Sequence, residues 1–328
     1  MNKRKKSRQG TLIVSLDFEL FWGVQDCNTL NEYQNNILGG RKAIPKMLQI
    51  FAKHGIHATW ATVGFLLANS YEELRDYFPE KKLRPTYKNS ILSSYRCFEK
   101  IGTDEKQAPC FYAPSLVKLI SEYEGQEIGC HTFSHYYCRE EGQTVEQFEA
   151  DVRAALKLAQ DHGYKLTSFV FPRNQSTKEH INVLRNLGFT SYRNEENDWI
   201  HNKIRFRPLL RLLRLLDVYF PLTGHGGYQP IVEDGIVDVW GSRMFKPYFR
   251  PLGLLENLKI KRIKRQMLYA AKNGLCFHLW WHPHNVGIRT KYHLNRLEEI
   301  FSYYDELKTK YGMRSLNMGE VAKDILSR

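Results

Sequence analysis

Two histidines four residues apart, His131 and His135, are the residues of this sequence best suited to bind a metal ion. They stand in the run Glu-Ile-Gly-Cys-His-Thr-Phe-Ser-His, residues 127–135. If this run forms a turn of helix, both imidazoles lie on one face and reach the same ion. Many pairs at this spacing are solvated surface residues, so the interpretation depends on which other residues the fold brings beside them.

Two carboxylates follow the first apolar run of the chain, Asp17 and Glu19 in Ser-Leu-Asp-Phe-Glu, residues 15–19. Because one residue separates them at the end of a predicted strand, their side chains can point the same way. Such a pair offers a metal ligand and a base, and a nearby cation keeps both groups ionised. The simpler alternative is that Asp17 caps a helix at the end of the strand.

Two further segments end in residues that could hold a catalytic carboxylate or transfer a proton. Arg173, in Phe-Pro-Arg-Asn-Gln, could hold a catalytic carboxylate through two hydrogen bonds, or could be an ordinary surface salt-bridge residue. Alternation along a strand puts His278, Trp280 and His282 on one side, and Pro283 ends that strand. A strand-end histidine beside bulky aromatics suits a general acid, although three histidines between 278 and 284 could also form a second metal site.

The elements that must position these residues follow a repeated strand–helix pattern. Short apolar runs alternate with amphipathic stretches, which predicts βα units around a mostly parallel sheet. We expect strands at 11–16, 57–63, 127–130, 166–171, 189–192 and 275–281, and helices at 40–53, 144–162, 177–187 and 291–311. Ligands of parallel α/β folds bind beyond the carboxyl ends of the strands, and the candidate residues all follow predicted strands.

The length of the chain fits one large α/β barrel. Its positive net charge indicates either an anionic partner or a surface that keeps the protein soluble. The chain has 328 residues and a net charge of +13. We expect a basic tail over residues 1–10 and a single domain over 11–328, with insertions at about 69–115 and 200–270. No nucleic-acid-binding module is recognisable, so we expect no nucleic acid partner.

The six cysteines have no CxxC spacing, and no apolar segment follows the basic N-terminus as a secretory signal would require. We therefore expect a cytoplasmic protein with free thiols. Residues 203–222 place arginines among leucines, which suggests peripheral contact with an anionic membrane surface or a lipid-linked diphosphate; the alternative is an ordinary core-facing helix with solvated arginines.

Taken in order, these segments resemble the polysaccharide deacetylase family, the NodB-homology group similar to carbohydrate esterase family 4. Residues 131–135 match its His-Ser/Thr-x-x-His motif, and residues 58–64 (Ala-Thr-Trp-Ala-Thr-Val-Gly) are similar to its Ala-Thr-Phe-Phe-x-x-Gly strand. His282 and Pro283 match its closing His-Pro. Its adjacent Asp-Asp is replaced by Asp-x-Glu, as in a divergent branch, and Arg173 follows its proline where the family's arginine precedes it.

The resemblance implies a distorted (β/α) barrel and a metal-dependent hydrolase that removes an acetyl group from an N-acetylated sugar. It implies Glu19, His131 and His135 as metal ligands, zinc being the best match, with cobalt, nickel and iron compatible. Asp17 would act as base and His282 as acid, with Arg173 beside them. The roles of Asp17 and Glu19 are exchangeable at this point.

The substrate is expected to be an N-acetylated sugar of cell-surface polysaccharide synthesis, free, nucleotide-linked or lipid-linked. We select five residues as candidates for sugar contacts: Trp22, Asp198, Trp199, Trp281 and His284. Asp198 is also placed to pair with a catalytic histidine and raise its pKa. The alternatives are a hydrolase of cyclic amides on the same fold and a noncatalytic barrel that binds carbohydrate or membrane.

Overall fold

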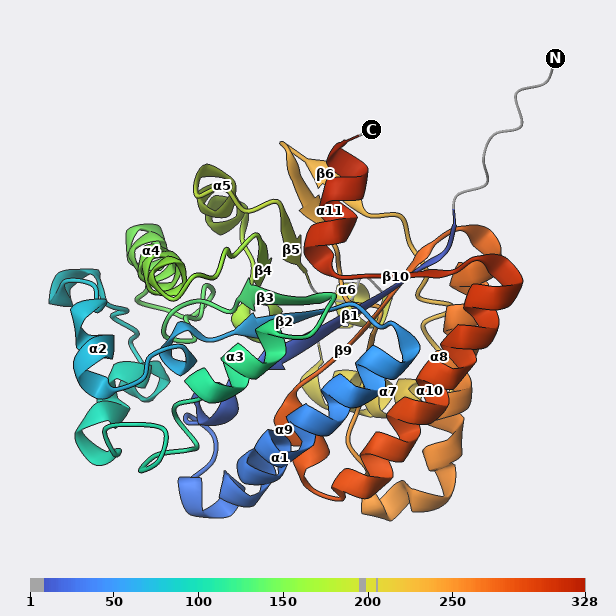
Figure 1. Ribbon diagram of the computed structural model, residues 1–328, viewed down its shortest axis with the longest axis horizontal. Coiled ribbons are helices and arrows are strands. Elements are labelled where there is room, and N and C mark those ends of the chain that lie inside the picture. Colours follow the sequence, from blue (N-terminus) through green and yellow to red (C-terminus); the bar gives the residue numbers. More distant parts are fainter. Residues whose placement is uncertain (1–8, 195–198, 205, 328) are drawn as a thin grey trace.

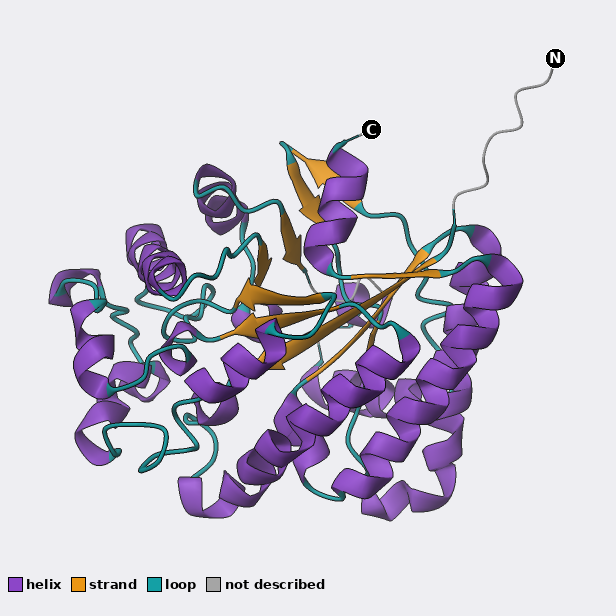
Figure 2. Ribbon diagram, viewed as in Figure 1, coloured by secondary structure: helices purple, strands orange, loops and turns teal. Residues whose placement is uncertain are grey.

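A mostly parallel sheet forms the centre of the computed structural model, which describes residues 9–194, 199–204 and 206–327. Its strand order is β6-β7-β5-β4-β3-β2-β1-β9-β8, with β10 paired to β1 and only β6–β7 antiparallel among the described pairs (Figures 1 and 2). The strands are β1 (Thr11–Phe18), β2 (Ala58–Thr62), β3 (Gln126–Cys130), β4 (Ser168–Val170), β5 (Ser191–Arg193), β6 (Ile231–Glu233), β7 (Ile236–Asp238), β8 (Arg243–Met244), β9 (Cys276–Trp281) and β10 (Arg314–Leu316).

Helices surround this sheet, as the predicted βα pattern requires (Figure 2). They are α1 (Leu30–His54), α2 (Tyr71–Asp76), α3 (Pro114–Ser121), α4 (Val145–Asp161), α5 (Lys178–Asn186), α6 (Trp199–Lys203), α7 (Arg207–Tyr219), α8 (Glu256–Asn273), α9 (Pro283–Gly287), α10 (Thr290–Tyr311) and α11 (Met318–Leu326). Short 3-10 turns occupy 20–23, 64–66, 81–83, 90–92, 94–100, 172–174 and 250–255. The expected α/β class is confirmed, and the barrel is distorted because β6 and β8 do not pair within the described residues.

The alternation of β1 determines what each face of the sheet can do. Its even-numbered residues pack outward in the main hydrophobic core: Leu12, Val14, Leu16 and Phe18. Its odd-numbered residues face the other way, and they change from apolar to polar along the strand: Ile13, Ser15 and Asp17. The carboxyl end of the inner face is therefore polar although it is buried, which is the arrangement of a site rather than of a core.

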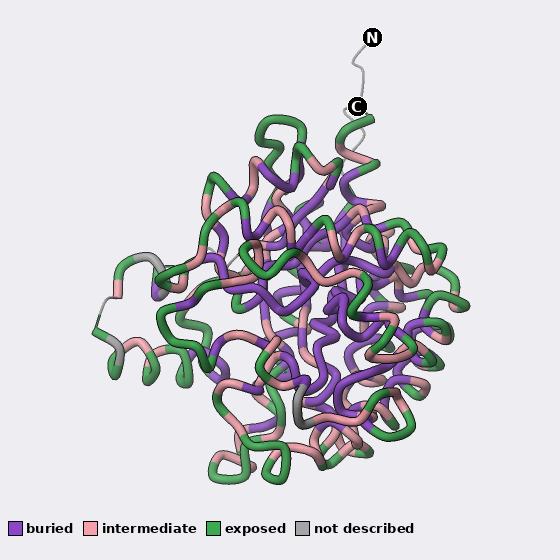
Figure 3. Tube along the Cα trace, turned by 90° about the vertical axis from the view of Figure 1, so that its left-hand side faces the viewer, coloured by how far each residue is buried: buried purple, intermediate pink, exposed green. Residues whose placement is uncertain are grey.

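The outer layer buries most of the apolar surface, and the tube in Figure 3 is buried through its interior and exposed on its outer turns. Helix α1 begins at Leu30 rather than at the predicted Gly40, because Thr29 and Glu32 form a capping box. The predicted helix at 144–162 is found as α4, and Thr144 and Gln147 form a capping box at its start.

Two elements at the C-terminus, β10 and α11, were not predicted. Helix α11 packs Met318 and Val321 against inner-face residues such as Ile13 and Val170, and so fills the amino end of the barrel. The segment 200–270 contains α6, α7, β6, β7, β8 and most of α8, and it extends the sheet beside both β5 and β9. Residues 1–8 of the predicted basic tail lie outside the described residues.

No helix in the described part of the chain combines the length and the apolarity that crossing a membrane requires.

Candidate metal centre and active site

The carboxyl end of the sheet brings Glu19, His131 and His135 together in a buried cluster. Glu19 Oε2 lies 3.2 Å from His131 Nε2 and 3.0 Å from His135 Nε2. The potential ligand atoms of the three residues all lie within 4.8 Å of one another. Glu19 directly follows β1 and His131 directly follows β3, so the two meet because parallel strands end at the same edge.

The hydrogen bonds of His131 show that this cluster fits a cation. Its Nδ1 lies 2.8 Å from the carbonyl oxygen of Val170, which can only accept, so the proton sits on Nδ1 and the Nε2 lone pair faces Glu19. A carboxylate oxygen and an imidazole lone pair repel each other at 3.2 Å unless a cation or a proton lies between them. Two imidazole nitrogens and one carboxylate oxygen form a ligand set that suits zinc and similar divalent metals.

The predicted helical turn at the histidine pair is wrong, because residues 131–135 form a loop. Thr132 and His135 both adopt left-handed backbone angles, with φ of 62° and 59°. Asp151 of α4 holds the loop: its carboxylate accepts hydrogen bonds from the Phe133 and Ser134 amides and from the Ser134 hydroxyl. Burial raises the pKa of Asp151 to about 6, against the effect of these three donors.

A series of interacting side chains contacts His135 at Nδ1, the ring nitrogen that does not face Glu19. Its Nδ1 lies 3.1 Å from the Tyr137 hydroxyl, which in turn donates to Asp26 at 3.5 Å. Arg173 Nη2 reaches Asp26 Oδ2 at 2.5 Å, and its guanidinium lies 4.4 Å from the centre of the Tyr137 ring. Burial raises the pKa of Tyr137 well above its ordinary value, which keeps the hydroxyl protonated. Within the described residues Arg173 pairs with Asp26 and not with Asp17 or Glu19, so the predicted pairing with a catalytic carboxylate is wrong; the residue lies behind His135, beside Tyr137 and Asp26.

Asp17 is held by a different arginine, Arg193 at the end of β5. Arg193 Nη1 donates to Asp17 Oδ1 at 2.6 Å and Nη2 donates to Oδ2 at 2.7 Å, and both side chains are buried. The guanidinium also lies 4.3 Å from the centre of the Trp280 ring. Burial alone would raise the pKa of Asp17, but Arg193 and then His282 outweigh it and lower the pKa below its ordinary value. The sequence signal we missed is an arginine at the end of the predicted strand 189–192.

His282 lies beside both carboxylates and is partly exposed to solvent. Its Nε2 lies 3.6 Å from Asp17 Oδ2 and 3.4 Å from Glu19 Oε1, and its side chain is 21 % exposed while theirs are each 5 % exposed. Burial pushes the pKa of Glu19 upward, but His282, His131 and His135 hold it well below its ordinary value. Both carboxylates are therefore ionised at neutral pH beside a histidine that solvent can reach.

Two of the residues selected for sugar contacts lie in the core instead. Trp22 is fully buried and donates its indole hydrogen bond to the Phe111 carbonyl at 2.8 Å. Trp281 is also fully buried, because strand alternation points it to the outer face, where it packs on Phe51 and Phe245. Neither can touch a sugar without rearrangement of the core, so these two predictions are wrong.

The other three selected residues have different positions. His284 stacks against His282 with ring centres 5.0 Å apart, is buried, and has its pKa lowered to about 3 by burial, so it is a neutral support behind the site. Trp199 is exposed on α6, and its indole donates to the Leu222 carbonyl. Asp198 lies outside the described residues.

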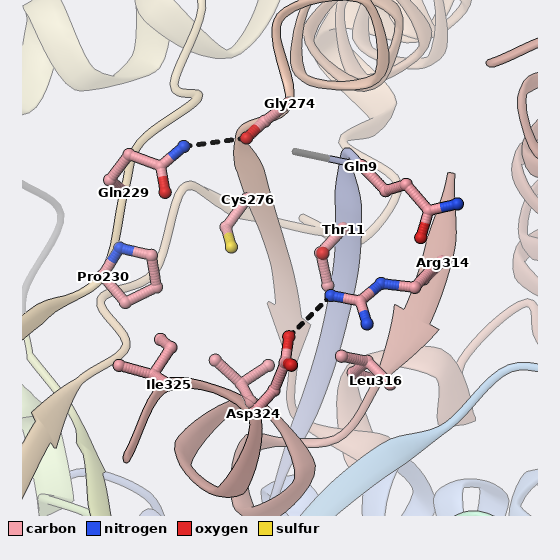
Figure 4. A pocket seen from close by; sticks show the side chains of 11 residues that line it. Gln9, Thr11, Gln229, Pro230, Gly274, Cys276, Arg314, Leu316, Asp324 and Ile325 are labelled. Atoms are coloured by element: carbon pink, nitrogen blue, oxygen red, sulfur yellow. Dashed lines mark hydrogen bonds and ion pairs between the residues drawn. The ribbon is translucent and has the colours of Figure 1, made fainter. Parts of the chain in front are cut away.

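A cavity of about 210 Å³ lies at the opposite end of the strands, beside Thr11 and Cys276 at the starts of β1 and β9 (Figure 4). Its charged lining residues Arg314 and Asp324 pair with each other at 2.7 Å. The cavity is separate from the cluster at the carboxyl ends, and its lining lacks the histidine–carboxylate chemistry found there.

Comparison with known proteins gives one family match. Residues 36–192 match the family model described as polysaccharide deacetylase, a range that includes His131 and His135 but not Asp17, Glu19 or His282. No curated protein matches the sequence significantly.

Several solved structures share the fold at low identity. A putative polysaccharide deacetylase from Mycobacterium smegmatis has 12% identity and a TM-score of 0.62, covering 99% of this chain and 93% of its own. A probable polysaccharide deacetylase from Pseudomonas aeruginosa has 10% identity and a TM-score of 0.57, covering 95% and 89%. The Puue allantoinase has 10% identity and a TM-score of 0.58, covering 97% and 91%.

Proposed function

We propose that this chain, whose residues 36–192 match the polysaccharide deacetylase family model, is a metal-dependent hydrolase that removes the acetyl group from an N-acetylated sugar. The observation that carries the proposal is the contact of two ionised, buried carboxylates with three histidines at the carboxyl end of the sheet. An isolated buried carboxylate is expensive to maintain, so this constellation supports chemistry rather than packing.

Glu19, His131 and His135 would hold the metal, and zinc fits this ligand set best. When bound, a divalent cation supplies Lewis-acid polarisation of the amide carbonyl and of the attacking water. The Asp151-supported loop and the Tyr137–Asp26–Arg173 chain fix the orientation of the two imidazoles before substrate arrives.

Asp17 would take a proton from the attacking water. Arg193 fixes both its oxygens and keeps the group ionised, which suits a base that must not rotate away. Since Glu19 contacts both metal-site histidines and Asp17 does not, the geometry supports Glu19 as the ligand and Asp17 as the base.

His282 would return a proton to the leaving amine. Asn285 Nδ2 lies 3.4 Å from His282 Nδ1, and the opposite ring nitrogen, Nε2, faces the two carboxylates. Proton donation from the partly exposed His282 side chain, beside two buried carboxylates, suits the departure of an amine.

All six cysteines are free thiols, five of them buried or half-buried, which supports a reducing compartment such as the cytoplasm. There the substrate would be a precursor of cell-surface polysaccharide. A cyclic amide would suit the same chemistry, and the allantoinase of the same fold keeps that second candidate open.

The test measures metal content and acetate release together. Purified protein should retain about one divalent ion per chain, and it should release acetate from N-acetylglucosamine oligomers or nucleotide-linked N-acetyl sugars. His131→Ala should lose both the metal and the activity, whereas Asp17→Asn should keep the metal and lose the activity. His162→Ala is the matched control, because His162, which follows α4, pairs with Glu73 of α2 rather than with a residue of the cluster.

If the protein opens the ring of cyclic amides and releases no acetate from N-acetylated sugars, it would be a cyclic-amide hydrolase instead. Absence of metal and absence of turnover on both substrate classes would contradict the proposal and favour a noncatalytic binding protein.

A further inference from the structure

Helix α7 exposes leucines where a helix of a globular protein normally exposes polar residues. Leu210 and Leu213 are half-buried, and Asp217 and Val218 are buried, so the helix already has a face turned to the protein. A separate set of leucines is exposed, Leu212 to 51 %: Leu209, Leu212, Leu215 and Leu216. At 100° per residue this set occupies a sector of about 120°.

The flank of this leucine sector is basic. Arg211 and Arg214 are both exposed, one turn apart on the same helix. The sequence from Phe206 to Leu222 contains a single acidic residue, Asp217, and that carboxylate is buried between Arg243 and Arg262. The exposed side of α7 therefore combines apolar surface with two exposed arginines.

A neighbouring loop continues the same surface. Residues 249–255 expose Phe249, Arg250 and Leu254, and Leu254 is 99 % exposed. This loop meets the end of α7 at Glu256, whose Oε1 accepts hydrogen bonds from the Tyr219 hydroxyl and from the Phe249 amide, each at 3.3 Å. We call the exposed side chains of α7 and of this loop the leucine–arginine face.

We propose that the leucine–arginine face docks on the surface of an anionic lipid bilayer. A helix with leucines on one sector and arginines beside it lies in the plane of the interface, with its apolar side chains among the acyl chains and its cations at the headgroups. The exposed leucine at the tip of the adjacent loop adds a second insertion point. Peripheral docking needs no membrane-spanning helix.

Charge favours a bilayer over a second copy of the chain. A two-fold dimer through this face would bring Arg211 and Arg214 of both copies together, and the described residues of α7 and of the 249–255 loop present no exposed carboxylate to neutralise them. Anionic headgroups supply the missing negative charge, and a net charge of +13 strengthens the attraction.

The face is formed by segments that follow two strands of the sheet that carries the candidate site. Helices α6 and α7, yellow in Figure 1, follow β5, the strand that ends at Arg193. The loop 249–255 follows β8, which pairs in parallel with β9 just before His282. If the proposed function holds, a docked molecule would meet sugars attached to lipids in the same surface.

Vesicle sedimentation tests the docking with no substrate present, so its outcome is independent of the proposed deacetylation. The full chain should pellet with vesicles of phosphatidylcholine mixed with phosphatidylglycerol, bind phosphatidylcholine vesicles weakly, and be released by high salt. Leu212→Ser combined with Leu216→Ser, and Arg211→Glu combined with Arg214→Glu, should each weaken binding at least about tenfold.

A charge-matched control lies on another helix: Lys42→Glu combined with Lys46→Glu on α1, both exposed, should change binding less than about threefold. His131→Ala should bind vesicles like the unaltered chain, and circular dichroism should verify that every variant is folded. Equal losses in the α1 control, or no binding to anionic vesicles, would overturn the proposal. If sedimentation velocity shows a dimer and the leucine substitutions make it monomeric, the face would instead bind a second copy of the chain.

Discussion

Arg193 and Asp17, 176 positions apart in sequence, form a buried pair joined by two parallel hydrogen bonds of 2.6 and 2.7 Å. The pair spans the inner face of the sheet from β5 to β1, and Ser15 accepts a third hydrogen bond from the same guanidinium at 2.9 Å. This geometry leaves Asp17 ionised and immobile beside His282.

Replacing Arg193 by lysine should lower kcat strongly, because a point charge cannot fix both oxygens of Asp17. We expect a loss of about 10²-fold or more in kcat with a smaller change in KM, since the base loses its orientation. Steady-state kinetics measures both constants, with whichever N-acetylated sugar releases acetate in the test described under Proposed function. Arg153→Lys is the control, because Arg153 forms an exposed ion pair with Glu149 on α4; equal effects on kcat in both variants would contradict a specific role for Arg193.

Gly23→Ala should weaken metal binding by a purely steric route. A Cβ at this position would come within 1.9 Å of Glu19 Oε1, so the carboxylate would have to leave its place beside the two histidines. We expect metal affinity to fall about tenfold or more while the fold persists. Competition with a chromogenic chelator measures the affinity, and Gly253→Ala, whose Cβ would meet only the end of the Tyr248 side chain, should keep the metal.

Tyr137→Phe should weaken the metal site from its outer shell. The change removes the hydroxyl that bonds His135 Nδ1 and interrupts the connection to Asp26. A loss of about 10–100-fold in metal affinity is expected for such a partner. Tyr136→Phe provides the control, because that hydroxyl bonds the Thr144 carbonyl and Gln143 instead; calorimetric titration with zinc should separate the two variants, and an unchanged affinity in Tyr137→Phe would contradict the argument.

Asp151→Asn should alter how stability depends on pH. The pKa of Asp151 is about 6 in the folded chain against an ordinary 3.8, so the folded state binds this proton more tightly than the unfolded state. The free energy of unfolding that this group contributes therefore rises as pH falls through about 6 toward 4, and the asparagine variant lacks that gain. The difference in thermal midpoint between the unaltered chain and Asp151→Asn should thus shift in favour of the unaltered chain from pH 7 to pH 5.

The companion variant Asp151→Ala should be less stable than Asp151→Asn at every pH. Asparagine can still accept from the Phe133 and Ser134 amides, whereas alanine leaves both donors unpaired at a cost of about 1–3 kcal/mol each. A flat difference between the unaltered chain and Asp151→Asn across this pH range would contradict the raised pKa.

The sequence by itself determined the strand–helix order and most of the residues at the site's edge. Alternation along a strand is local, so it correctly put Asp17 at the end of β1 and His278, Trp280 and His282 on one side of β9. Applied to Trp281, the same rule would have placed that residue in the core. The spacing of Thr144 and Gln147 also indicates the capping box of α4, whereas that of Thr29 and Glu32 was missed and α1 was expected to begin at Gly40.

Only the tertiary structure decided how these residues act on one another. The histidine pair converges through left-handed residues in a loop that Asp151 holds from another element, rather than through helical spacing. Arg193 instead of Arg173 reaches Asp17, and the missing Cβ of Gly23 makes room for Glu19. These contacts depend on which strands become neighbours and on how closely residues far apart in the sequence approach one another. No local sequence pattern encodes either of these.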